Sequence, residues 1–581
     1  MKRSCKKFSL IALITSVYFF SCQNVKAQFE TKKYVAFANI YNSIRYFQPT
    51  ESSKIIDWDN FAVYGLNSIR NCKNSIEFID SIRNIFSSIN SIFICSSKNE
   101  SPKNFHFQNS QSLYYYEHNG LGTGCNLGYS SKIKEFLPQD SIVRDTMISL
   151  FLSECNVYFK FPILVVNQQI SLQDSLNLLN VKNKINKIAS SELKEFSESF
   201  RISNAVIIWG IFKNFYPYRN ELNYDWDKEL SSFIDKVIKT KGKDEYLIEL
   251  KKFIAKYNDG HIVLNSYSDT LRGYYPPVEL KLINNNIYIS KTLNNNIKNI
   301  QGAKVLKING MEADKYLSLF KEQVSASTIE NRNYRTLKRI LDGGRKTEFF
   351  LNIENQERKK IEIKLTRDIP AKEYEKKIIQ YYPKYRAIND SVYYLNLSQV
   401  TMAEIDSLYV TLSNKKVIIC DLRYYPTNNK NFLKYLLKCR DTISWIGIER
   451  IIYPNQKSGD YTYNGWYLEP SDKHISSRCI FLTTSNSISF SESYLSLIKY
   501  YNLGMIAGEK SGGTNGDYNC YNLFNQYYFY FTGARVLQLD GSPLYGSGII
   551  PDINIFDDID ELKQDKDYYI DQLIKFMGNG K

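Results

Sequence analysis

The sequence predicts a multidomain α+β protein, with a duplicated helical region near its N-terminus and an α/β domain at its C-terminus. At 581 residues the chain is too long for one hydrophobic core, so three or four domains are expected. The apolar share of 43% is sufficient for globular domains. The domain types follow from a helical pattern that recurs at a fixed offset and from an alternation of strand and helix patterns after residue 388.

The first 27 residues have the pattern of a secretory signal peptide. Basic residues precede a mostly apolar core at 10–20, and Ala27 ends a small-residue cleavage motif. An alternative interpretation of the same segment makes Cys22 a lipid-modified N-terminus. The apolar core is too short to span a bilayer, and no later stretch reaches transmembrane length. We therefore expect an exported protein in the periplasm, in the cell envelope or outside the cell, either soluble or tethered by lipid.

Charge and cysteine content argue against several classes of function. Five of the 75 basic residues lie in the signal, so the net charge falls from +15 to about +10 in the mature chain. This excess is spread without a basic stripe, and a nucleic-acid partner is not expected. No CxxC pair occurs, so a zinc site is not predicted. No other cofactor is predicted either. Export permits disulfides, most plausibly among Cys72, Cys95, Cys125 and Cys155.

The internal repeat combines a helical pattern, a proline and an Asp-Trp-Asp motif. Apolar residues at helical spacing precede Pro49 and, 168 residues later, Pro217. The Asp-Trp-Asp motifs begin at Asp57 and Asp225, again 168 residues apart. Proline stops a helix, and an acidic residue is favoured at the positive start of the next one. Each copy is therefore expected to be a helical hairpin.

These patterns divide the chain into four predicted domains after the signal. Between the helical copies, short strand patterns with turns indicate a small β subdomain, and from 273 onward short strands dominate again. After residue 388, strand patterns alternate with helical ones, which favours βαβ units and a mainly parallel sheet. The predicted domains are 28–165 (first hairpin plus β subdomain), 166–272 (second hairpin), 273–370 (β module) and 385–577 (α/β domain).

Residues 479–501 combine an apolar strand pattern, a serine-rich turn at 483–491 and a helix pattern. A buried strand, a sharp turn with hydroxyl groups and a helix form the geometry that exposes a nucleophilic serine beside backbone N–H donors. Ser489 is the candidate nucleophile, and Ser491, just before Glu492, is a candidate helix N-cap. Histidines are rare, and His261 stands at a loop–strand junction, where functional groups concentrate.

Four motifs, in this order, resemble those of the tail-specific (C-terminal processing) protease family, and its tricorn-like branch in particular. They are Asp421-Leu422-Arg423, Ser489-Phe490-Ser491-Glu492, the glycine-rich loop 508–516 and Gly548-Ile549-Ile550-Pro551-Asp552. The resemblance implies that 385–577 is a ClpP/crotonase-like catalytic domain and that 273–370 is a PDZ-like domain. It also implies that the helical copies form the N-terminal helical region of the family.

The resemblance also implies a site. It makes Ser489 the nucleophile. One branch activates the serine with a lysine 25 residues later, but that position is Thr514 here, so the resemblance gives the role of general base to His261. Asp259 or Tyr545 would orient the histidine.

The remaining implied residues belong to the loops around the serine. The backbone N–H groups of Phe490 and Tyr425 would bind an oxyanion, although Pro426 removes one donor from the second loop. Gly508, Glu509 and Gly513 would shape the glycine-rich loop.

The implied function is that of an exported serine endopeptidase or carboxyl-terminal processing peptidase acting on polypeptides. The substrate would bind by its C-terminus or as an added strand. A catalytically weak or inactive protein that binds peptides or apolar ligands is the alternative, motivated by Gly260 in place of a serine, by Tyr545 in place of an acid and by the Tyr424–Thr427 loop. An envelope structural or assembly factor is a third class.

Overall fold

The computed structural model describes residues 31–87, 89, 92–98, 112–122, 128–137, 146–153, 156–166, 172–267, 272–454, 456, 459–563 and 567–578. The chain forms two compact units: residues 1–250 with Glu449–Asp460, and Lys251–Ile448 with Tyr461–Lys581. The predicted multidomain α+β class is confirmed. The predicted signal peptide, with Cys22, lies outside the described residues. In the described part of the chain, no helix combines the length and the apolar character of a membrane span.

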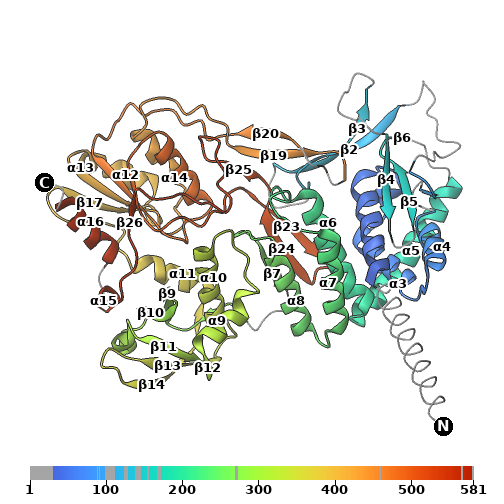
Figure 1. Cartoon of the computed structure of the whole chain (residues 1–581). Helices are drawn as coiled ribbons and strands as arrows, with labels where there is room; N and C mark the ends of the chain where they lie inside the picture. Colours follow the sequence, from blue (N-terminus) through green and yellow to red (C-terminus); the bar gives the residue numbers. More distant parts are fainter. Residues whose placement is uncertain are drawn as a thin grey trace, which may run out of the picture. The chain divides into compact units, whose positions relative to one another are not determined.

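The helices of the first unit reproduce the sequence repeat. In the first copy, helical residues 31–47 are followed by α2 (Glu51–Ile55) and α3 (Trp58–Ile69), and the second copy consists of α6 (Glu198–Phe215) and α7 (Trp226–Lys239). Asp57 and Asp225 are the N-caps of α3 and α7, as the Asp-Trp-Asp motifs predict. Figure 1 shows both helical groups, in blue and in green.

Equivalent contacts occur in the two copies. Tyr41 Oη donates to the carbonyl of Trp58 at 2.8 Å, and Trp209 Nε1 donates to the carbonyl of Trp226 at 2.8 Å. The two copies touch at Asn42 and Gly210, which are equivalent positions of the repeat. The Asn42 side chain fills the space that a Cβ at position 210 would need. Asn42 Nδ2 donates to Val206 O at 3.1 Å. The repeat is therefore a structural duplication whose two halves differ at their contact.

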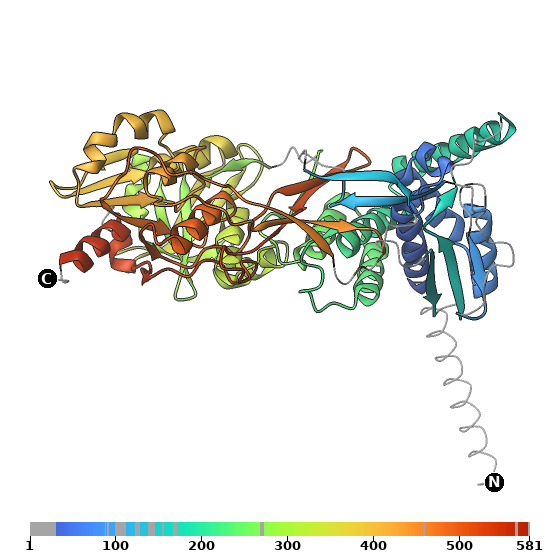
Figure 2. The ribbon, with the colours of Figure 1, turned by 90° about the horizontal axis from the view of Figure 1, so that it is seen from above.

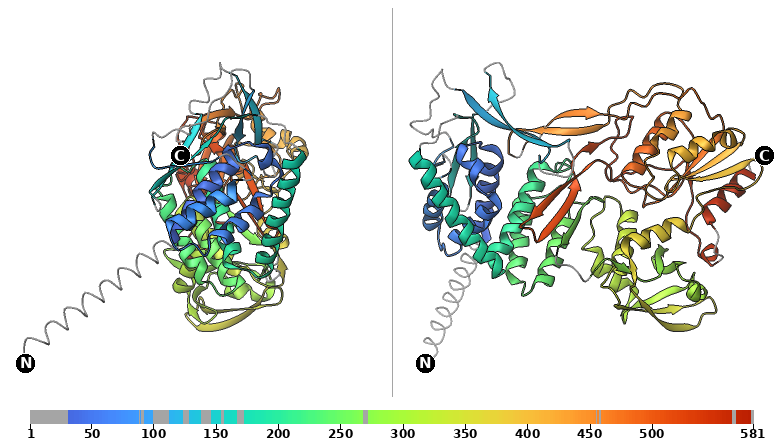
Figure 3. Two further views of the ribbon diagram at one scale, coloured as in Figure 1. Left: turned by 90° about the vertical axis from the view of Figure 1, so that its right-hand side faces the viewer. Right: turned by 180° about the vertical axis from the view of Figure 1, so that it is seen from behind.

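Small antiparallel sheets and further helices complete the first unit. One sheet has the strand order β1-β5-β4, and β2 pairs with β3, β6 and β19. The elements are α4 (Ser75–Phe86), β1 (Phe93–Cys95), β2 (Leu113–Asn119), β3 (Ser130–Phe136), β4 (Met147–Leu152), β5 (Val157–Pro162), β6 (Val165–Val166), α5 (Leu172–Lys194) and α8 (Lys243–Ala255), the last crossing the unit boundary. α3 packs against α5 and α6, as the rear view in Figure 3 shows.

Two of the four cysteines for which bridges are predicted, Cys72 and Cys95, are not disulfide-bonded. Cys72 and Cys95 are free and buried, and Cys125 and Cys155 lie outside the described residues. The Sγ atom of Cys72 lies 3.3 Å from Ser81 Oγ, so this thiol packs in the core as a small, weakly polar residue. Cys520 forms a disulfide instead.

Within the second unit, an antiparallel β module occupies the range in which one is predicted, 273–370. Its antiparallel sheet has the order β14-β13-β11-β10-β9, and a turn at Asn309 and Gly310, both with positive φ, joins β11 to β12. The strands are β9 (Val278–Ile283), β10 (Asn286–Thr292), β11 (Lys304–Ile308), β12 (Met311–Glu312), β13 (Glu348–Glu354) and β14 (Lys360–Thr366), and β8 (Tyr274–Tyr275) pairs separately with β15 (Ile369–Pro370). Helices α9 (Ala313–Lys321), α10 (Ile329–Leu341) and α11 (Ala371–Gln380) contribute Ala313, Leu337 and Ile378 to its core.

The predicted α/β domain is built on a mixed sheet of order β16-β17-β18-β21-β22-β26. Strands β17 to β26 are parallel, and only the edge strand β16 is antiparallel. Their bounds are β16 (Tyr385–Ala387), β17 (Val392–Asn396), β18 (Val417–Asp421), β21 (Arg478–Thr483), β22 (Met505–Gly508) and β26 (Ile553–Asn554).

Helices cover both faces of this sheet, as Figures 1 and 2 show. On one face Leu497 of α14 packs with Phe432 and Ile405, and on the other Leu573 of α16 packs with Tyr394. The helices are α12 (Met402–Ser407), α13 (Tyr409–Ser413), η2 (Lys430–Tyr435), α14 (Phe490–Tyr500), α15 (Ile559–Leu562) and α16 (Tyr568–Gly578). The helical pattern at 430–437 forms a short 3₁₀ helix rather than an α-helix.

Two boundaries differ from the predicted domains because strands pair with segments that are distant in the sequence. The sequence predicts His261 in the domain of the second helical hairpin, but the unit boundary falls before it. After His261, β7 (Val263–Ser266) pairs with β24 (Tyr527–Thr532), which in turn pairs with β23 (Tyr518–Leu523). Residues 449–460, predicted inside 385–577, belong to the first unit, where β19 (Ile446–Ile451) pairs with β2. β20 (Asp460–Asn464) and β25 (Arg535–Val536) also pair with β19.

Candidate active site

Ser489 occupies a strained turn between β21 and α14. Its φ of 58° and ψ of −117° are unfavourable for a residue with a side chain, and its N–H donates to Thr514 O at 2.7 Å. The turn before it is closed by Ser487, whose N–H donates to Thr484 O and whose Oγ accepts from the N–H of Thr484. A strained serine between a buried strand and a helix is the geometry of a nucleophile elbow.

The candidate N-cap at Ser491 is wrong. Helix α14 begins at Phe490, so the cap position is Ser489 itself, and the Ser489 side chain makes no capping hydrogen bond. Ser491 is buried in the first turn, with Oγ 3.4 Å from Tyr424 O. Ser491 does not cap the helix because α14 starts directly after the strained residue Ser489. The Ser489 hydroxyl takes no part in the hydrogen bonds at the start of the helix.

Two backbone N–H groups beside Ser489 have no acceptor among the residues that the structure describes: those of Phe490 and Tyr425. Phe490 is the first residue of α14, so its N–H points out of the positive end of the helix dipole. The side chains of the same two residues also approach each other, with ring centroids 5.9 Å apart. Such groups can bind a developing oxyanion.

The loop that carries Tyr425 is fixed to the turn. Thr484 Oγ1 donates to Arg423 O at 3.3 Å, and Ser487 Oγ donates to Leu422 O at 2.8 Å. Arg423 is itself buried between the carboxylates of Asp421 and Asp567, which raise the pKa of its guanidinium although burial acts to lower it. The charged motif after β18 therefore positions a loop and does not point at Ser489.

Glu492 organises the glycine-rich loop from one turn inside α14. Its buried carboxyl group accepts from Ser511 Oγ at 2.6 Å, from Gly513 N at 2.7 Å and from Thr514 N at 3.0 Å. Burial raises the pKa of Glu492 to about 8 despite these donors. Gly513 has a φ of 70°, and a side chain there would press on Thr328. Gly508 ends β22 beside Thr483 of β21.

Thr514 connects the serine turn to the loop that carries His261. Its carbonyl accepts from Ser489 N, and its Oγ1 accepts from Gly260 N at 2.9 Å. A Cβ at position 260 would approach Thr514 Oγ1 to 2.8 Å, so the hydroxyl occupies the space of a side chain at Gly260. Two departures from the family pattern, Thr514 and Gly260, therefore fit each other.

The imidazole of His261 is held by a threonine. Nδ1 lies 2.8 Å from Thr532 Oγ1, at the end of β24 and 271 residues away in the chain. The buried Asp259 carboxylate holds the backbone on both sides, because Oδ1 accepts from His261 N at 2.8 Å and Oδ2 accepts from Thr532 N at 2.9 Å. Asp259 thus acts on the two backbones rather than on the ring. No hydrogen bond joins His261 to Ser489, both of which the structure describes.

Burial dominates the protonation of His261. It lowers the pKa of the imidazole, as does the nearby Arg335 guanidinium, whereas Asp259 and Asp517 raise it, and the net shift is downward. A neutral imidazole that donates from Nδ1 to Thr532 presents Nε2 as a proton acceptor.

Tyr545, the other candidate for orienting His261, acts further away. Its Oη donates to Tyr257 O at 3.2 Å, four residues before the histidine. It therefore supports the start of the loop that carries His261.

A segment of the β module touches both halves of the site. Arg335 of α10 donates through Nη1 to Gly260 O and through Nη2 to Ile262 O at 3.4 Å, the carbonyls on either side of His261. Asn331 Nδ2, one turn earlier, donates to Ser485 O of the serine turn at 2.7 Å. Ser327 Oγ contacts Thr514 Oγ1 at 2.6 Å. Helix α10 therefore contacts both the candidate base loop and the candidate nucleophile turn.

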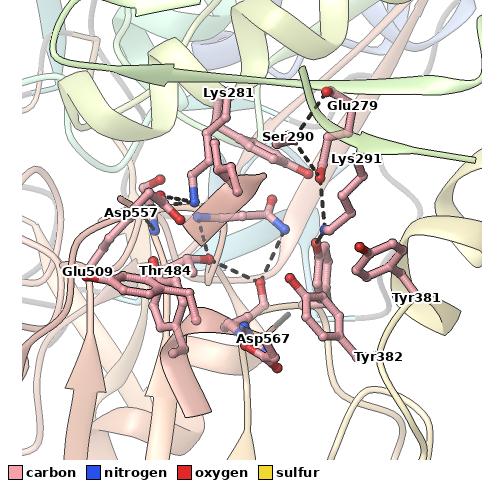
Figure 4. Close-up of a pocket in the computed structure, with 18 of the residues that line it drawn as sticks. Glu279, Lys281, Ser290, Lys291, Tyr381, Tyr382, Thr484, Glu509, Asp557 and Asp567 are labelled. Carbon is pink, nitrogen blue, oxygen red and sulfur yellow. Dashed lines mark hydrogen bonds and ion pairs between the residues drawn. The ribbon is translucent and has the colours of Figure 1, made fainter. Parts of the chain in front are cut away.

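A polar pocket beside the serine turn contains further contacts between the β module and the α/β domain (Figure 4). Lys281 of β9 lies between Asp557 and Glu509, and Lys291 pairs with Glu279 at 2.8 Å. Glu509 also accepts from Ser485 N at 3.0 Å; burial acts to raise its pKa, but Lys281 and this N–H lower it overall. The pocket joins the β module to the turn through paired charges, and Glu509 contacts both Lys281 and the backbone of the turn.

Sequence reasoning missed Thr532, Arg335 and the bridging role of Thr514. Thr532 ends an aromatic strand, Tyr527–Phe531, and only a pairing of β24 with β7 would have indicated it. Arg335 belongs to the polar face of an amphipathic helix, where a solvent-exposed role is the usual expectation. The sequence marks Thr514 only as the position where one branch of the family has a lysine.

The fold and the site together define a protein with a serine on a strained strand-to-helix turn, at the carboxyl end of a strand in an open parallel sheet. Residues 391–555 match the family model of peptidase family S41. The matched residues lie within the α/β domain, so this part of the chain is similar to peptidase family S41.

Solved structures agree at the level of the fold. The structure of mature CPAF complexed with lactacystin is 12% identical, with a TM-score of 0.52, and the match covers 65% of this chain and 97% of that chain. A second structure of mature CPAF gives the same identity and TM-score, with 65% and 96% of the two chains covered. No curated protein sequence matches the chain.

Replacing Thr532 tests its contact with His261. We expect Thr532→Val to lower kcat/KM by about 10-fold to 100-fold, because the imidazole loses the partner that sets its orientation and tautomer. Thr532→Ser keeps the hydroxyl and should retain most of the activity. Steady-state hydrolysis of one peptide by the three proteins measures the effect. Equal rates for Thr532→Val and the wild type would show that Thr532 does not position His261.

Proposed function

We propose that this protein is a serine peptidase that hydrolyses peptide bonds of polypeptides, with Ser489 as nucleophile and His261 as general base. The observation that carries the proposal is the assembly around Thr514, whose carbonyl holds the strained Ser489 backbone while its hydroxyl holds the backbone beside His261. A serine–histidine pair from two segments performs acyl transfer on unrelated folds. This pairing corresponds to the Ser–His branch of the family.

The proposed reaction has two acyl-transfer steps. Ser489 Oγ attacks the scissile carbonyl carbon while Nε2 of His261 takes its proton, and the resulting oxyanion is stabilised by the N–H groups of Phe490 and Tyr425. The C–N bond then breaks as His261 returns the proton to the leaving amine. Water attacks the acyl-enzyme, with its proton passing to His261 and then to Ser489 Oγ as the carboxylate product leaves. Thr532 and Asp259 keep the imidazole oriented throughout.

A catalytically weak peptide-binding protein is the second candidate. It is favoured by the contact that His261 Nδ1 makes with a neutral hydroxyl, whereas a carboxylate would stabilise the imidazolium ion that forms during catalysis. It also accounts for the missing hydrogen bond between His261 and Ser489. Catalytic hydrogen bonds are often long before substrate binds, so this second observation is compatible with both candidates.

A fluorophosphonate probe separates the two candidates. The peptidase proposal expects the probe to label the wild-type protein, with the adduct on Ser489 located by peptide mass spectrometry. Hydrolysis of an unstructured protein substrate should accompany the labelling. A folded wild-type protein that binds peptides, takes up no label and releases no fragments would establish the binding protein instead.

The rate should depend on pH through His261. The base works in its neutral form, so kcat/KM rises as pH increases through the His261 pKa. Because burial lowers this pKa from its ordinary value of 6.5, the midpoint of the acid limb is expected below 6.5. A pH–rate profile between 4.5 and 8 on an uncharged substrate measures it. A midpoint above 6.5 would contradict the buried, neutral base.

We also propose that the chain is exported and that its β module is PDZ-like. The first 27 residues support export by their signal-peptide pattern, and Cys22 is the candidate site of a lipid tether. Mass spectrometry of the mature N-terminus distinguishes cleavage after Ala27 from lipidation at Cys22. The antiparallel sheet with α10 against β9 supports the PDZ-like assignment.

A further inference from the structure

A cavity of about 720 Å³ opens beside the serine turn and the His261 strand. We call it the basic cleft. Its lining comes from β7, from α10, and from Asn486 and Ile488 just before Ser489. Ile262, the neighbour of His261, also lines it. The basic cleft therefore borders the two segments that carry the candidate catalytic residues.

Cations outnumber carboxylates on the walls of the basic cleft. The charged lining residues are Lys251, Arg272, Arg335, Lys338, Arg339, Asp342 and Glu375. Both carboxylates lie in ion pairs with lining cations, Arg339 with Asp342 at 3.2 Å and Lys338 with Glu375 at 2.5 Å. Among the residues that line the cleft, cations therefore outnumber carboxylates by five to two.

Arg335 is the cation closest to the proposed chemistry. Its two hydrogen-bonded nitrogens contact only carbonyl oxygens, those of Gly260 and Ile262. Arg335 is partly buried, and burial lowers the pKa of its guanidinium although Asp259 acts to raise it. A desolvated cation is stabilised when an anionic ligand enters the same low-dielectric space.

The opposite wall of the basic cleft is a sheet edge. Strand β7 is the last strand in the order β23-β24-β7, and its residues Val263–Ser266 all line the cleft. Within the described residues, β7 pairs with β24 alone. An edge strand offers unpaired N–H and C=O groups to a second extended chain.

A neighbouring cavity at the same turn has a different character. It measures about 200 Å³ and is lined mainly by apolar and aromatic side chains, and its charged lining residues are Glu279, Lys338 and Glu375. Lys338, Glu375 and Ile488 line both cavities, but the smaller one has one cation and two carboxylates. The concentration of positive charge therefore belongs to one side of the serine turn and is not a general property of the site.

We propose that the basic cleft binds an acidic, extended segment of the substrate, paired as an added strand on β7 with its carboxylate side chains facing α10. This rests on the proposed function, because the segment belongs to the polypeptide that Ser489 would cleave. The chemistry recognised is a carboxylate. Aspartate and glutamate side chains are the source because the cations extend along α10 from Arg335 to Arg339 instead of forming a single end pocket.

Binding to an inactive variant tests the proposal without turnover. Fluorescein-labelled peptides of one sequence, with either four glutamates or four glutamines, are titrated into Ser489→Ala and followed by anisotropy. We expect the glutamate peptide to bind at least about 10-fold more tightly, with the preference shrinking as salt is raised. Amidating the C-terminus of the glutamate peptide should leave its affinity unchanged. Loss of the preference on amidation, or equal affinity for both peptides, would overturn the proposal.

A charge reversal in the cleft provides the matched comparison. Lys338→Glu in the Ser489→Ala background should reduce the preference to less than about threefold, since it places a second carboxylate beside Glu375. Lys307→Glu changes the same charge on β11 of the same module, outside the cleft, and should leave the preference intact. Lys338→Gln, a milder change, serves if the reversal impairs folding. A preference that survives both Lys338 variants would also overturn the proposal.

The outcomes separate this inference from the proposed function. If Ser489→Ala prefers the glutamate peptide but the wild type hydrolyses no peptide and takes up no fluorophosphonate, the cleft proposal stands and the peptidase proposal fails. If the wild type cleaves both peptides with equal kcat/KM, the peptidase proposal stands and the cleft proposal fails.

Discussion

Ser489→Ala is expected to lose peptide hydrolysis by a factor of about 10⁴ or more, and to lose fluorophosphonate labelling completely. Ser489 is the residue on the strained turn, and its neighbour Phe490 keeps a backbone N–H without an acceptor in the described structure. Removing Oγ leaves no nucleophile, while the turn keeps its hydrogen bonds through backbone atoms. Steady-state hydrolysis with active-site labelling measures both effects.

Ser491→Ala is the matched control for this prediction. It removes a hydroxyl two residues away that makes one long contact, at 3.4 Å, to Tyr424 O. We expect its activity to remain within a few-fold of the wild type, because surrounding helix bonds hold the backbone. If Ser489→Ala still takes up the probe, the nucleophile lies elsewhere, and a loss of labelling in Ser491→Ala would identify that serine as the better candidate.

Asp259→Ala is expected to lower kcat/KM by about 10²-fold to 10⁴-fold. The carboxylate accepts from the backbone N–H groups of both His261 and Thr532, the two residues whose side chains meet. Its removal leaves two buried donors without an acceptor and frees both backbones to move. The proposed base then loses its position relative to Ser489.

Asp259→Asn separates positioning from charge. The side-chain oxygen can still accept one of the two N–H groups, so we expect an intermediate loss of activity. Thermal unfolding of both variants checks that the domain remains folded, and the rate of probe labelling reports on the site itself. Unchanged labelling in a folded Asp259→Ala protein would show that the His261 loop keeps its position without this carboxylate.

The strand–turn–helix around Ser489 could be predicted because its signals are local. An apolar run, polar turn residues and an amphipathic helix are consecutive in the sequence, and the structure forms β21 and α14 there. The Ser491 cap failed for a reason that is also local. Capping statistics describe ordinary helix starts, whereas this helix starts directly from a strained residue.

The partner of His261 could not be predicted, because its position depends on long-range pairing. Thr532 reaches the imidazole only when β24 pairs with β7, across 271 residues of sequence. No motif marks Thr532, and resemblance to the family directed attention to Asp259 and Tyr545 instead. Arg335 was missed similarly, because its targets are the backbone carbonyls of Gly260 and Ile262, which carry no sequence signal.

The Asn42–Gly210 contact has a consequence for the symmetry of the first unit. Asn42 and Gly210 lie 168 positions apart and meet where the two copies touch, but one has an amide side chain and the other has no side chain. A self-complementary interface would require the same residue on both sides. The two hairpins thus resemble the subunits of a dimer, but they are covalently linked in one chain and differ in sequence where they touch. Their association is intramolecular and therefore independent of protein concentration.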